Sequence, residues 1–370
     1  MSRAAGWVTL LLTILSCAPL AAADSSAAPP AIRHVFLIVL ENQSFNHVFS
    51  PRSAMPYLSQ TLAAEGAVLR SFYAIGHNSL GNYVALVSGQ APNEATQGDC
   101  LVYGDFRQSE PGLDADGQAR GTGCVYPKWV PSLPDQLEAA GLTWKGYMED
   151  MGRDPHREAR TCGHAALGAR DPLLEATPTD QYASKHNPFI YFHAIIDDAQ
   201  RCARHVINLD ALTADLRTPA STPNLVFITP NLCHDGHDTQ CANGERGGAA
   251  GADAFLAEWV PRILASAAFQ RDGLLIVTFD EADGTSASSA AACCNERALS
   301  GARLPPGLWG PGGGRVGAVL VSRSIRPGTV SDVAYNHYSL LRTIETLFNL
   351  RPLGFAADPQ LAGFGPDVFR

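Results

Sequence analysis

The sequence predicts an α/β domain with a doubly wound, largely parallel sheet, helices on both faces and loop insertions. Fully apolar runs rich in β-branched residues, such as 34–40 and 274–279, are typical of parallel strands that are covered on both sides. Segments with helical signals alternate with these runs, and no internal repeat interrupts the alternation. Ligands of such sheets bind beyond the carboxyl ends of the strands, and polar residues follow several of the runs.

The order of the predicted elements supports this alternation. Strands are predicted at 34–40, 68–73, 142–148, 225–229, 274–279 and 316–321. Helices are predicted at 56–66, 132–140, 253–267 and 338–348, around the leucines of 209–216, and from the polar turn 76–82 onward. Two segments rich in glycine and proline, 90–130 and 284–314, are predicted to be loop insertions.

The first 23 residues have the features of a signal peptide. An arginine precedes the apolar segment 7–15, and 21–23 provide the small residues of a cleavage site. A lipoprotein site ending at Cys17 is the alternative, but Leu15 fits that pattern less well. The mature chain, 24–370, is therefore expected in the periplasm or outside the cell.

Nine cysteines are present, and eight remain once Cys17 is set aside. An even number in an exported chain indicates disulfides, and the absence of paired CxxC units disfavours zinc. Pairing between sequence neighbours predicts Cys100–Cys124, Cys162–Cys202 and Cys233–Cys241. It leaves undecided whether the adjacent Cys293 and Cys294 are bonded.

Charge and hydropathy exclude two classes of partner. The net charge of -9 and the pI near 5.6 give no electrostatic basis for nucleic-acid binding. No apolar segment of the mature chain is long enough to cross a bilayer. Neither nucleic-acid binding nor a membrane span is therefore expected of the mature chain.

Polar residues gather where the predicted strands end and where helices begin. They are carboxylates, amides, imidazoles and one hydroxyl: Glu41, Asn42, Ser79, Asn82, Asp235, His237, Asp280, Glu281 and His337. A single acidic residue after a strand is usually part of a turn, and a single histidine before a helix is usually a cap. The joint occurrence of these groups at one predicted sheet edge favours a functional site.

These residue types suit phosphoryl transfer. Carboxylate and amide oxygens bind a divalent metal ion, which lowers the pKa of a serine hydroxyl so that it can attack phosphorus. Histidines and Asn82 would then donate hydrogen bonds to the phosphoryl oxygens. An acyl hydrolase with a Ser-His-Asp triad is disfavoured, because no serine, Ser79 included, stands in a G-x-S-x-G turn.

Several segments resemble, in the same order, the motifs of a bacterial phosphoesterase family. This family contains phosphatidylcholine-preferring phospholipases C and secreted acid phosphatases and is related to the alkaline phosphatase superfamily. The segments are Glu41-Asn-Gln-Ser-Phe45, His77-Asn-Ser-Leu-Gly-Asn-Tyr83, 228–238, 276–281 and 335–345. The resemblance spans nearly all of the mature chain and implies an alkaline phosphatase-like fold, with 24–370 as a single catalytic domain.

The resemblance also implies roles for individual residues. Ser79 would be the nucleophile, and the metal ligands would be Glu41, Asn42, Asp280 and Glu281. Asp235 would be a further ligand or would orient a histidine. The side chains around the phosphate would be His77, Asn82, His186, His237 and His337. Asn78 and Gly81 stand where the family pattern has prolines, which predicts a looser turn before Ser79.

The expected function is hydrolysis of a phosphoric ester through a phosphoserine intermediate. A small phosphomonoester is favoured, because the chain is short for the large phospholipases and shows no additional lipid-binding domain. Cleavage of a phospholipid headgroup of the phospholipase C type is the alternative, and an inactive exported binding protein of the same fold is a further one. Oxygen ligands favour calcium, magnesium or manganese, whereas added imidazole permits zinc or iron.

Overall fold

The computed structural model describes residues 1, 31–284, 288–299 and 301–370. Apart from residue 1, the predicted signal peptide and Cys17 fall outside the described residues, as do parts of the predicted insertion 284–314. Of the helices in the described ranges, none combines the length and the apolar character that a membrane span requires.

An eight-stranded sheet forms the centre of the protein. Its strands, in spatial order, are β13 (Thr329–Ser331), β2 (Ala67–Leu69), β12 (Ala318–Ser322), β11 (Gly273–Phe279), β1 (His34–Leu40), β10 (Leu225–Thr229), β7 (Trp144–Met148) and β9 (Val206–Asn208). β12 runs antiparallel to both of its neighbours, and all other adjacent strands of this sheet are parallel. The predicted, largely parallel sheet is confirmed.

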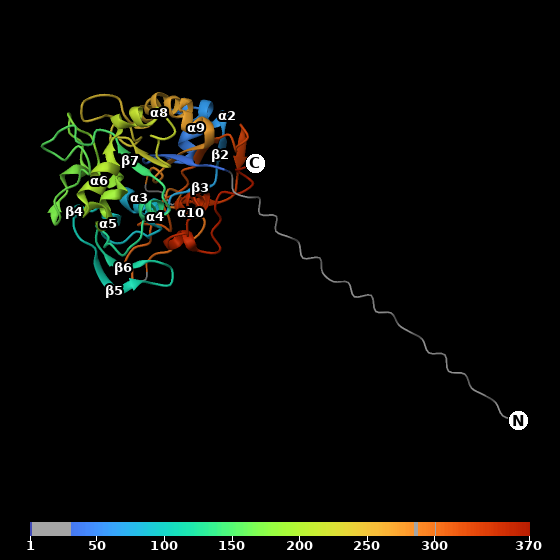
Figure 1. The fold of residues 1–370 in the computed structure, drawn as a ribbon, viewed down its shortest axis with the longest axis horizontal. Helices are drawn as coiled ribbons and strands as arrows, with labels where there is room; N and C mark the ends of the chain where they lie inside the picture. The colour runs from blue at the N-terminus through green and yellow to red at the C-terminus, as the bar shows by residue number, and fades with distance from the viewer. Residues whose placement is uncertain (2–30, 285–287, 300) are drawn as a thin grey trace.

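Helices cover both faces of this sheet (Figure 1). One layer contains α2 (Ala63–Glu65), α8 (Gly248–Ala265) and α9 (Ala267–Asp272). The other contains α3 (Ser79–Ser88), α4 (Leu133–Ala139) and α10 (His337–Leu347). The remaining α-helices of the described chain are short: α1 (Phe45–Val48), α5 (His193–Ile196), α6 (Ala199–His205) and α7 (Leu212–Asp215). The predicted two-sided covering is therefore confirmed.

Three predicted elements differ from the structure. The predicted strand 68–73 is two strands, because β2 joins the central sheet and β3 (Phe72–Tyr73) leaves it to pair with β14 (Tyr335–Asn336). The predicted helix 56–66 is a π-helical segment, η1 (Tyr57–Leu62), followed by α2. The predicted loop 90–130 contains strands, since β4 (Val102–Tyr103) pairs with β8 (Ala169–Arg170) and β5 (Arg107–Leu113) pairs with β6 (Ala119–Thr122).

All residues of α3 are buried, so this helix is part of the core. It packs against α10, and Gly81 allows Pro92 to approach it closely on another side. A Cβ atom at Gly81 would lie 2.9 Å from Cγ of Pro92, closer than such contacts allow. Ser79, the first residue of α3, is therefore held by packing on several sides.

The eight cysteines of the described chain form four disulfides. The structure has the three predicted pairs, Cys100–Cys124, Cys162–Cys202 and Cys233–Cys241. It also bonds Cys293 to Cys294, which the sequence left undecided. The Cys100–Cys124 bond closes the base of the segment that carries β5 and β6.

The carboxyl group of Glu345 on α10 is buried in the core and makes stability depend on pH. One of its carboxylate oxygens accepts a hydrogen bond from the Leu353 amide (2.9 Å), and the other is buried without a hydrogen-bond partner among the described residues. Burial raises the pKa of Glu345 to about 9. The folded state thus holds this proton more tightly than the unfolded chain does, and stability falls as the pH rises through this interval.

We expect Glu345→Gln to remove the part of the pH dependence of the unfolding free energy that comes from Glu345, at most about 1.4 kcal/mol per pH unit. The glutamine keeps an acceptor oxygen for Leu353 and carries no titratable proton. Urea unfolding of both proteins at pH 5 and pH 8.5 should show a smaller loss of stability with pH in the variant. An identical loss in the two proteins would contradict the assignment.

Candidate active site

Three adjacent strands deliver polar residues to one edge of the sheet. β11, β1 and β10 run parallel, with Leu40 beside Phe279 in the register. The amide of Asp280 donates to the Leu40 carbonyl (2.8 Å), and the amide of Glu41 donates to the Asp235 carbonyl (2.7 Å). The first residues beyond β1 and β11 and the loop beyond β10 are thus joined directly, as the sequence predicted.

Ser79 is joined to this edge by its hydroxyl. Its Oγ donates a hydrogen bond to Oε1 of Glu41 at 2.7 Å, and both side chains are buried. Ser79 is also the first residue of α3, where the helix dipole favours negative charge, and the Leu80 amide at this helix start donates to Oδ1 of Asp99 (2.9 Å). Because the hydroxyl proton points at Glu41, the oxygen lone pairs remain available for attack on a bound ligand.

Asn82 holds the turn before Ser79 from within. Its Oδ1 accepts hydrogen bonds from the amides of Ile75 and Gly76 (both 3.1 Å). Its Nδ2 donates to the carbonyls of Gly76 (2.8 Å) and Asn78 (3.2 Å). The predicted loosening of this turn is therefore not observed. Hydrogen-bond donation by Asn82 to a phosphate, as predicted, would require breaking one of these contacts.

Lys185 belongs to the cluster although no motif in the sequence marks it. Its Nζ lies 3.0 Å from Oε1 of Glu41 and 3.7 Å from Oδ2 of Asp99. Burial opposes the charge on Lys185, but Glu41 and Asp99 outweigh burial and raise the pKa of the ammonium. Conversely, burial would raise the pKa of Glu41, but Lys185 and His186 hold that pKa well below its usual range.

His186 and Asp235 flank Glu41. Nε2 of His186 lies 3.2 Å from Oε1 of Glu41, and its Nδ1 lies 3.8 Å from Oδ2 of Asp235. Burial lowers the pKa of His186, so its ring is neutral at neutral pH. Burial and the nearby Glu41 raise the pKa of Asp235 well above its usual range. The structure therefore brings His186 and Asp235, both predicted site residues, close to Glu41.

His237 lies at the solvent side of the cluster. Its side chain is 49% exposed, and its Nδ1 lies 3.5 Å from Oε2 of Glu41. The hydrogen bond to Glu41 raises the pKa of His237, which favours a protonated ring at mildly acidic pH. This histidine is thus suited to donate a proton to a ligand that enters from solvent.

Asp280 and Asn42 connect the ends of two strands. Oδ1 of Asp280 accepts hydrogen bonds from the amides of Asn42 (3.2 Å) and Glu281 (2.6 Å). Asn42 adopts a left-handed backbone with φ of 55°, a conformation that asparagine tolerates better than most residues. Burial, with repulsion from Glu281 and Glu41, raises the pKa of Asp280 well above its usual range. Because burial and the neighbouring carboxylates disfavour the negative charge on Asp280, a cation bound beside it would stabilise the ionised form.

His77 contacts Glu281 and a backbone carbonyl. Its Nδ1 lies 2.8 Å from Oε2 of Glu281, and its Nε2 lies 2.8 Å from the Ser289 carbonyl. Burial lowers the pKa of His77, but the interaction with Glu281 outweighs burial and raises it. Both ring nitrogens have protein partners, so this geometry favours a role in orienting Glu281 over the predicted contact with phosphate.

His337 presents an unprotonated nitrogen to the cluster. Its Nε2 lies 2.7 Å from the Asp280 carbonyl, which can only accept, so Nε2 carries the hydrogen. Burial lowers the pKa of His337 to about 4, and Nδ1 is therefore a free lone pair at neutral pH. Nδ1 is buried and has no hydrogen-bond partner in the described ranges. In this state His337 can accept a hydrogen bond or bind a cation but cannot donate to phosphate, contrary to its predicted role.

The buried carboxylates fit a divalent cation. One ligand atom from each of Glu41, His186 and Asp280 lies within 4.8 Å of the others. Glu41 Oε2, Asp280 Oδ2 and Asp235 Oδ2 are buried and accept no hydrogen bond of ordinary length and angle within the described part of the chain; the histidines near Glu41 Oε2 and Asp235 Oδ2 lie 3.5 and 3.8 Å away. Carboxylates in this state need a proton or a cation, and oxygen-rich groups of this kind bind divalent metals.

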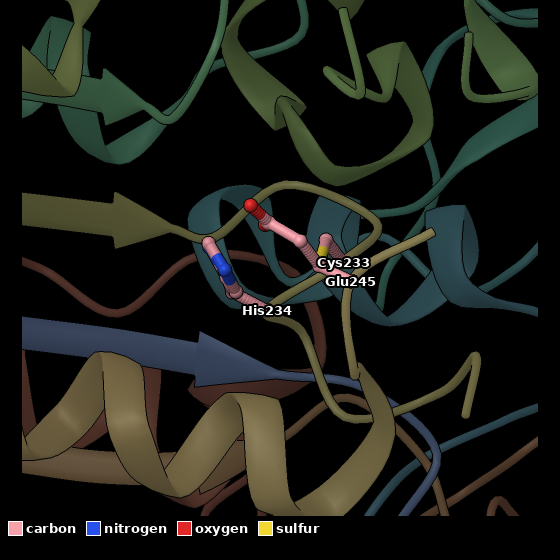
Figure 2. Close-up of side chains that lie close together, drawn as sticks. All are labelled: Cys233, His234 and Glu245. Atoms are coloured by element: carbon pink, nitrogen blue, oxygen red, sulfur yellow. The ribbon is translucent and has the colours of Figure 1, made fainter. Parts of the chain in front are cut away.

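A second group with metal-ligand chemistry does not fit a cation. Figure 2 shows Cys233, His234 and Glu245 close together in the loop that follows β10. The sulfur of Cys233 is bonded to Cys241, and Nδ1 of His234 lies 2.8 Å from Oε1 of Glu149. A disulfide sulfur is not a thiolate ligand, so this group has a structural role.

Comparison with known sequences identifies relatives over most of the chain. The chain is 28% identical over 316 residues to the phosphate-repressible acid phosphatase of Penicillium chrysogenum. This alignment covers 84% of this chain and 58% of that protein. It is 25% identical over 337 residues to the phosphatidylinositol-3-phosphatase of Mycobacterium tuberculosis, covering 90% of this chain and 83% of that one. The chain thus spans little more than half the length of the fungal acid phosphatases it matches.

Solved structures and a family model complete the comparison. The crystal structure of Ps i-CgsB in complex with k-i-k-neocarrahexaose matches 90% of this chain and 76% of its own, with a TM-score of 0.50 and 12% identity, which concerns the fold alone. The crystal structure of a protein in the alkaline phosphatase superfamily from Vibrio parahaemolyticus matches 90% of this chain and 72% of its own, with a TM-score of 0.46 and 12% identity. The Phosphoesterase family model matches residues 50–351. The chain therefore belongs to the Phosphoesterase family.

Proposed function

We propose that this protein is a phosphoric monoester hydrolase in which Ser79 attacks phosphorus. The observation that carries the proposal is the 2.7 Å hydrogen bond from Ser79 Oγ to Glu41, at a helix start and beside the buried Asp280 and His186. Nucleophile activation requires such a hydroxyl next to a group that binds a metal or takes a proton. Relatives named acid phosphatases support the same reaction class.

We propose that a divalent cation is held mainly by Glu41 and Asp280, with Ser79, Asn42 and Glu281 as further ligands. Oε2 of Glu41 and Oδ2 of Asp280 support this assignment, because both are buried and accept no hydrogen bond of ordinary geometry from the described residues. When bound, such an ion would neutralise the carboxylates and lower the pKa of the Ser79 hydroxyl. Asp235, His186 and His337 would contribute further contacts around the ion, since they lie on the same sheet edge.

The proposed reaction has two steps. In the first, a bond forms between Ser79 Oγ and phosphorus while the ester bond breaks; the Ser79 proton passes to Glu41, and His237 gives its proton to the departing oxygen. In the second, the neutral His237 takes a proton from the water that attacks phosphorus; the bond between phosphorus and Ser79 Oγ breaks, and Glu41 returns its proton to Ser79 as phosphate leaves. The exposure of His237 and its raised pKa support the acid role in the first step.

A substrate borne on a phospholipid headgroup is a second candidate. The observation that favours it is the match to the mycobacterial protein named a phosphatidylinositol-3-phosphatase, which this chain covers to 83%. Cleavage of the phospholipase C type remains the alternative among phosphoric esters.

The four disulfides support the proposal that the protein acts after export, because such bonds persist in oxidising compartments.

Release of phosphate from p-nitrophenyl phosphate by the purified protein tests the proposal. We expect turnover that falls by at least about 100-fold after chelation and returns when magnesium, manganese, calcium or zinc is added. Cleavage of p-nitrophenyl phosphorylcholine without cleavage of the monoester would instead favour the phospholipase C alternative. Metal binding and phosphate binding with no turnover of any ester would favour the inactive binding protein.

A further inference from the structure

A cavity of about 760 Å³ lies outside the cluster around Glu41. It is formed by β5, β6 and the segments 93–98 and 301–308, and β5 and β6 extend from one end of the molecule in Figure 1. Its lining includes Gln97, Arg107, Arg120, Arg303, Leu304 and Leu308. The lining thus combines cationic and apolar side chains.

The cavity shares two walls with the Ser79 site. The first is the segment 93–98, in which the Gln97 carbonyl accepts a hydrogen bond from Nδ2 of Asn78 (2.7 Å). The second is the segment 304–309, in which the Pro306 carbonyl accepts a hydrogen bond from the His77 amide (3.1 Å). Both contacts reach the two residues that directly precede Ser79. The segments that form the cavity are therefore bonded directly to the turn that carries Ser79.

Trp309 extends the second wall towards the site. Its ring stacks on His77, with a centroid distance of 4.9 Å and an angle of 22° between the planes. Trp309 remains 47% exposed, and Leu304 on the same segment is 48% exposed. Exposed side chains of this size beside a pocket form an apolar surface for a ligand.

The cationic part of the cavity is unusual in a chain whose net charge is -9. Arg120 pairs through Nη2 with Asp114, but its Nη1 is buried and meets no hydrogen-bond acceptor in the described part of the chain. Arg107 forms no ion pair with any carboxylate of the described residues. Arg303 lies 3.5 Å from Glu94, the carboxylate that shares the cavity. Guanidinium groups with free donors bind carboxylates and phosphates.

We propose that this cavity binds the leaving group of the substrate and favours phosphomonoesters whose leaving group is an apolar chain that ends in a second negative charge. The inference rests on the proposed function, because it assigns a leaving-group site to the Ser79 reaction. The apolar chain would lie along Trp309 and Leu304. The terminal anion would meet Arg107 and the free Nη1 of Arg120.

A series of ω-phosphooxy alkanoic acids with 6, 9 and 12 carbons (about 8 to 15 Å) and their methyl esters provides matched probes. Acid and ester differ only in the terminal charge. We expect kcat/KM for the acid to exceed that for the ester by at least about 10-fold at one or more chain lengths. Arg107→Ala should abolish this preference and leave turnover of p-nitrophenyl phosphate unchanged. Arg262→Ala, at an exposed position of α8 on the opposite side of the molecule in Figure 1, is the control and should keep the preference.

Calorimetric binding of the same acids and esters separates this inference from the proposed function. If p-nitrophenyl phosphate is not hydrolysed, the proposed function fails, and the binding preference alone decides whether the cavity selects the anion. Equal affinity and equal turnover for acid and ester at all three lengths would overturn the inference. A preference that Arg107→Ala retains in full would overturn it as well.

Discussion

Replacing Ser79 with alanine is expected to lower kcat for p-nitrophenyl phosphate by at least about 10⁴-fold, because the variant has no oxygen to form the intermediate. The fold should persist, since the Ser79 hydroxyl donates to Glu41, which keeps its contacts with Lys185 and His186 in the variant. The measurement is phosphate release under saturating substrate, together with thermal unfolding of both proteins.

Ser88→Ala is the matched control for this prediction. Ser88 is a buried serine at the other end of α3, where its hydroxyl donates to the Val84 carbonyl at 2.7 Å. We expect Ser88→Ala to keep most of the activity, because it changes the same helix without touching the cluster. Retention of more than about a tenth of kcat in a folded Ser79→Ala protein would exclude Ser79 as the nucleophile.

Replacing Asp280 with asparagine is expected to weaken metal binding by at least about 10-fold and to reduce activity with it. The variant keeps an acceptor oxygen for the amides of Asn42 and Glu281 and removes one buried negative charge. Metal content after dialysis against a defined free concentration, measured by mass spectrometry, gives the affinity. Without metal, the variant should be at least as stable as the parent, since repulsion from Glu281 and Glu41 is reduced.

Asp253→Asn provides the comparison at another buried carboxylate. Asp253 on α8 also accepts two backbone hydrogen bonds, from the amides of Tyr57 and Leu58 (both 3.0 Å). The same substitution there should leave metal content unchanged. Full metal occupancy in Asp280→Asn would show that the ligand assignment is wrong.

The central strands could be predicted because burial leaves a simple pattern. Every residue of β1, β10 and β11 is buried, so these strands have continuous apolar sequences that end abruptly at Glu41, Pro230 and Asp280. β5 could not be predicted in this way, because all its residues are exposed and no apolar alternation marks it. The division of 68–73 between two sheets depends on the distant strands β12 and β14, which local sequence does not specify.

The gathering of these polar residues at one sheet edge was predictable, but the partners of individual side chains were not. Parallel register brings Glu41 and Asp280 together, and the sequence predicted both of them at the carboxyl ends of parallel strands. Lys185 was missed because a lysine in a polar stretch is normally solvated, whereas here it lies against Glu41. His77 and His337 were assigned to phosphate, but their hydrogen bonds depend on the Ser289 and Asp280 carbonyls, whose positions only the folded chain defines.

The phosphorylated intermediate is the most direct measure of the central claim. The protein would be mixed with excess p-nitrophenyl phosphate, quenched in acid within one turnover, digested and analysed by mass spectrometry. We expect one added phosphoryl group on the peptide that contains Ser79, and none in protein quenched before substrate is added. A burst of p-nitrophenol with the phosphoryl group on another residue, or with no phosphorylated peptide at all, would contradict it.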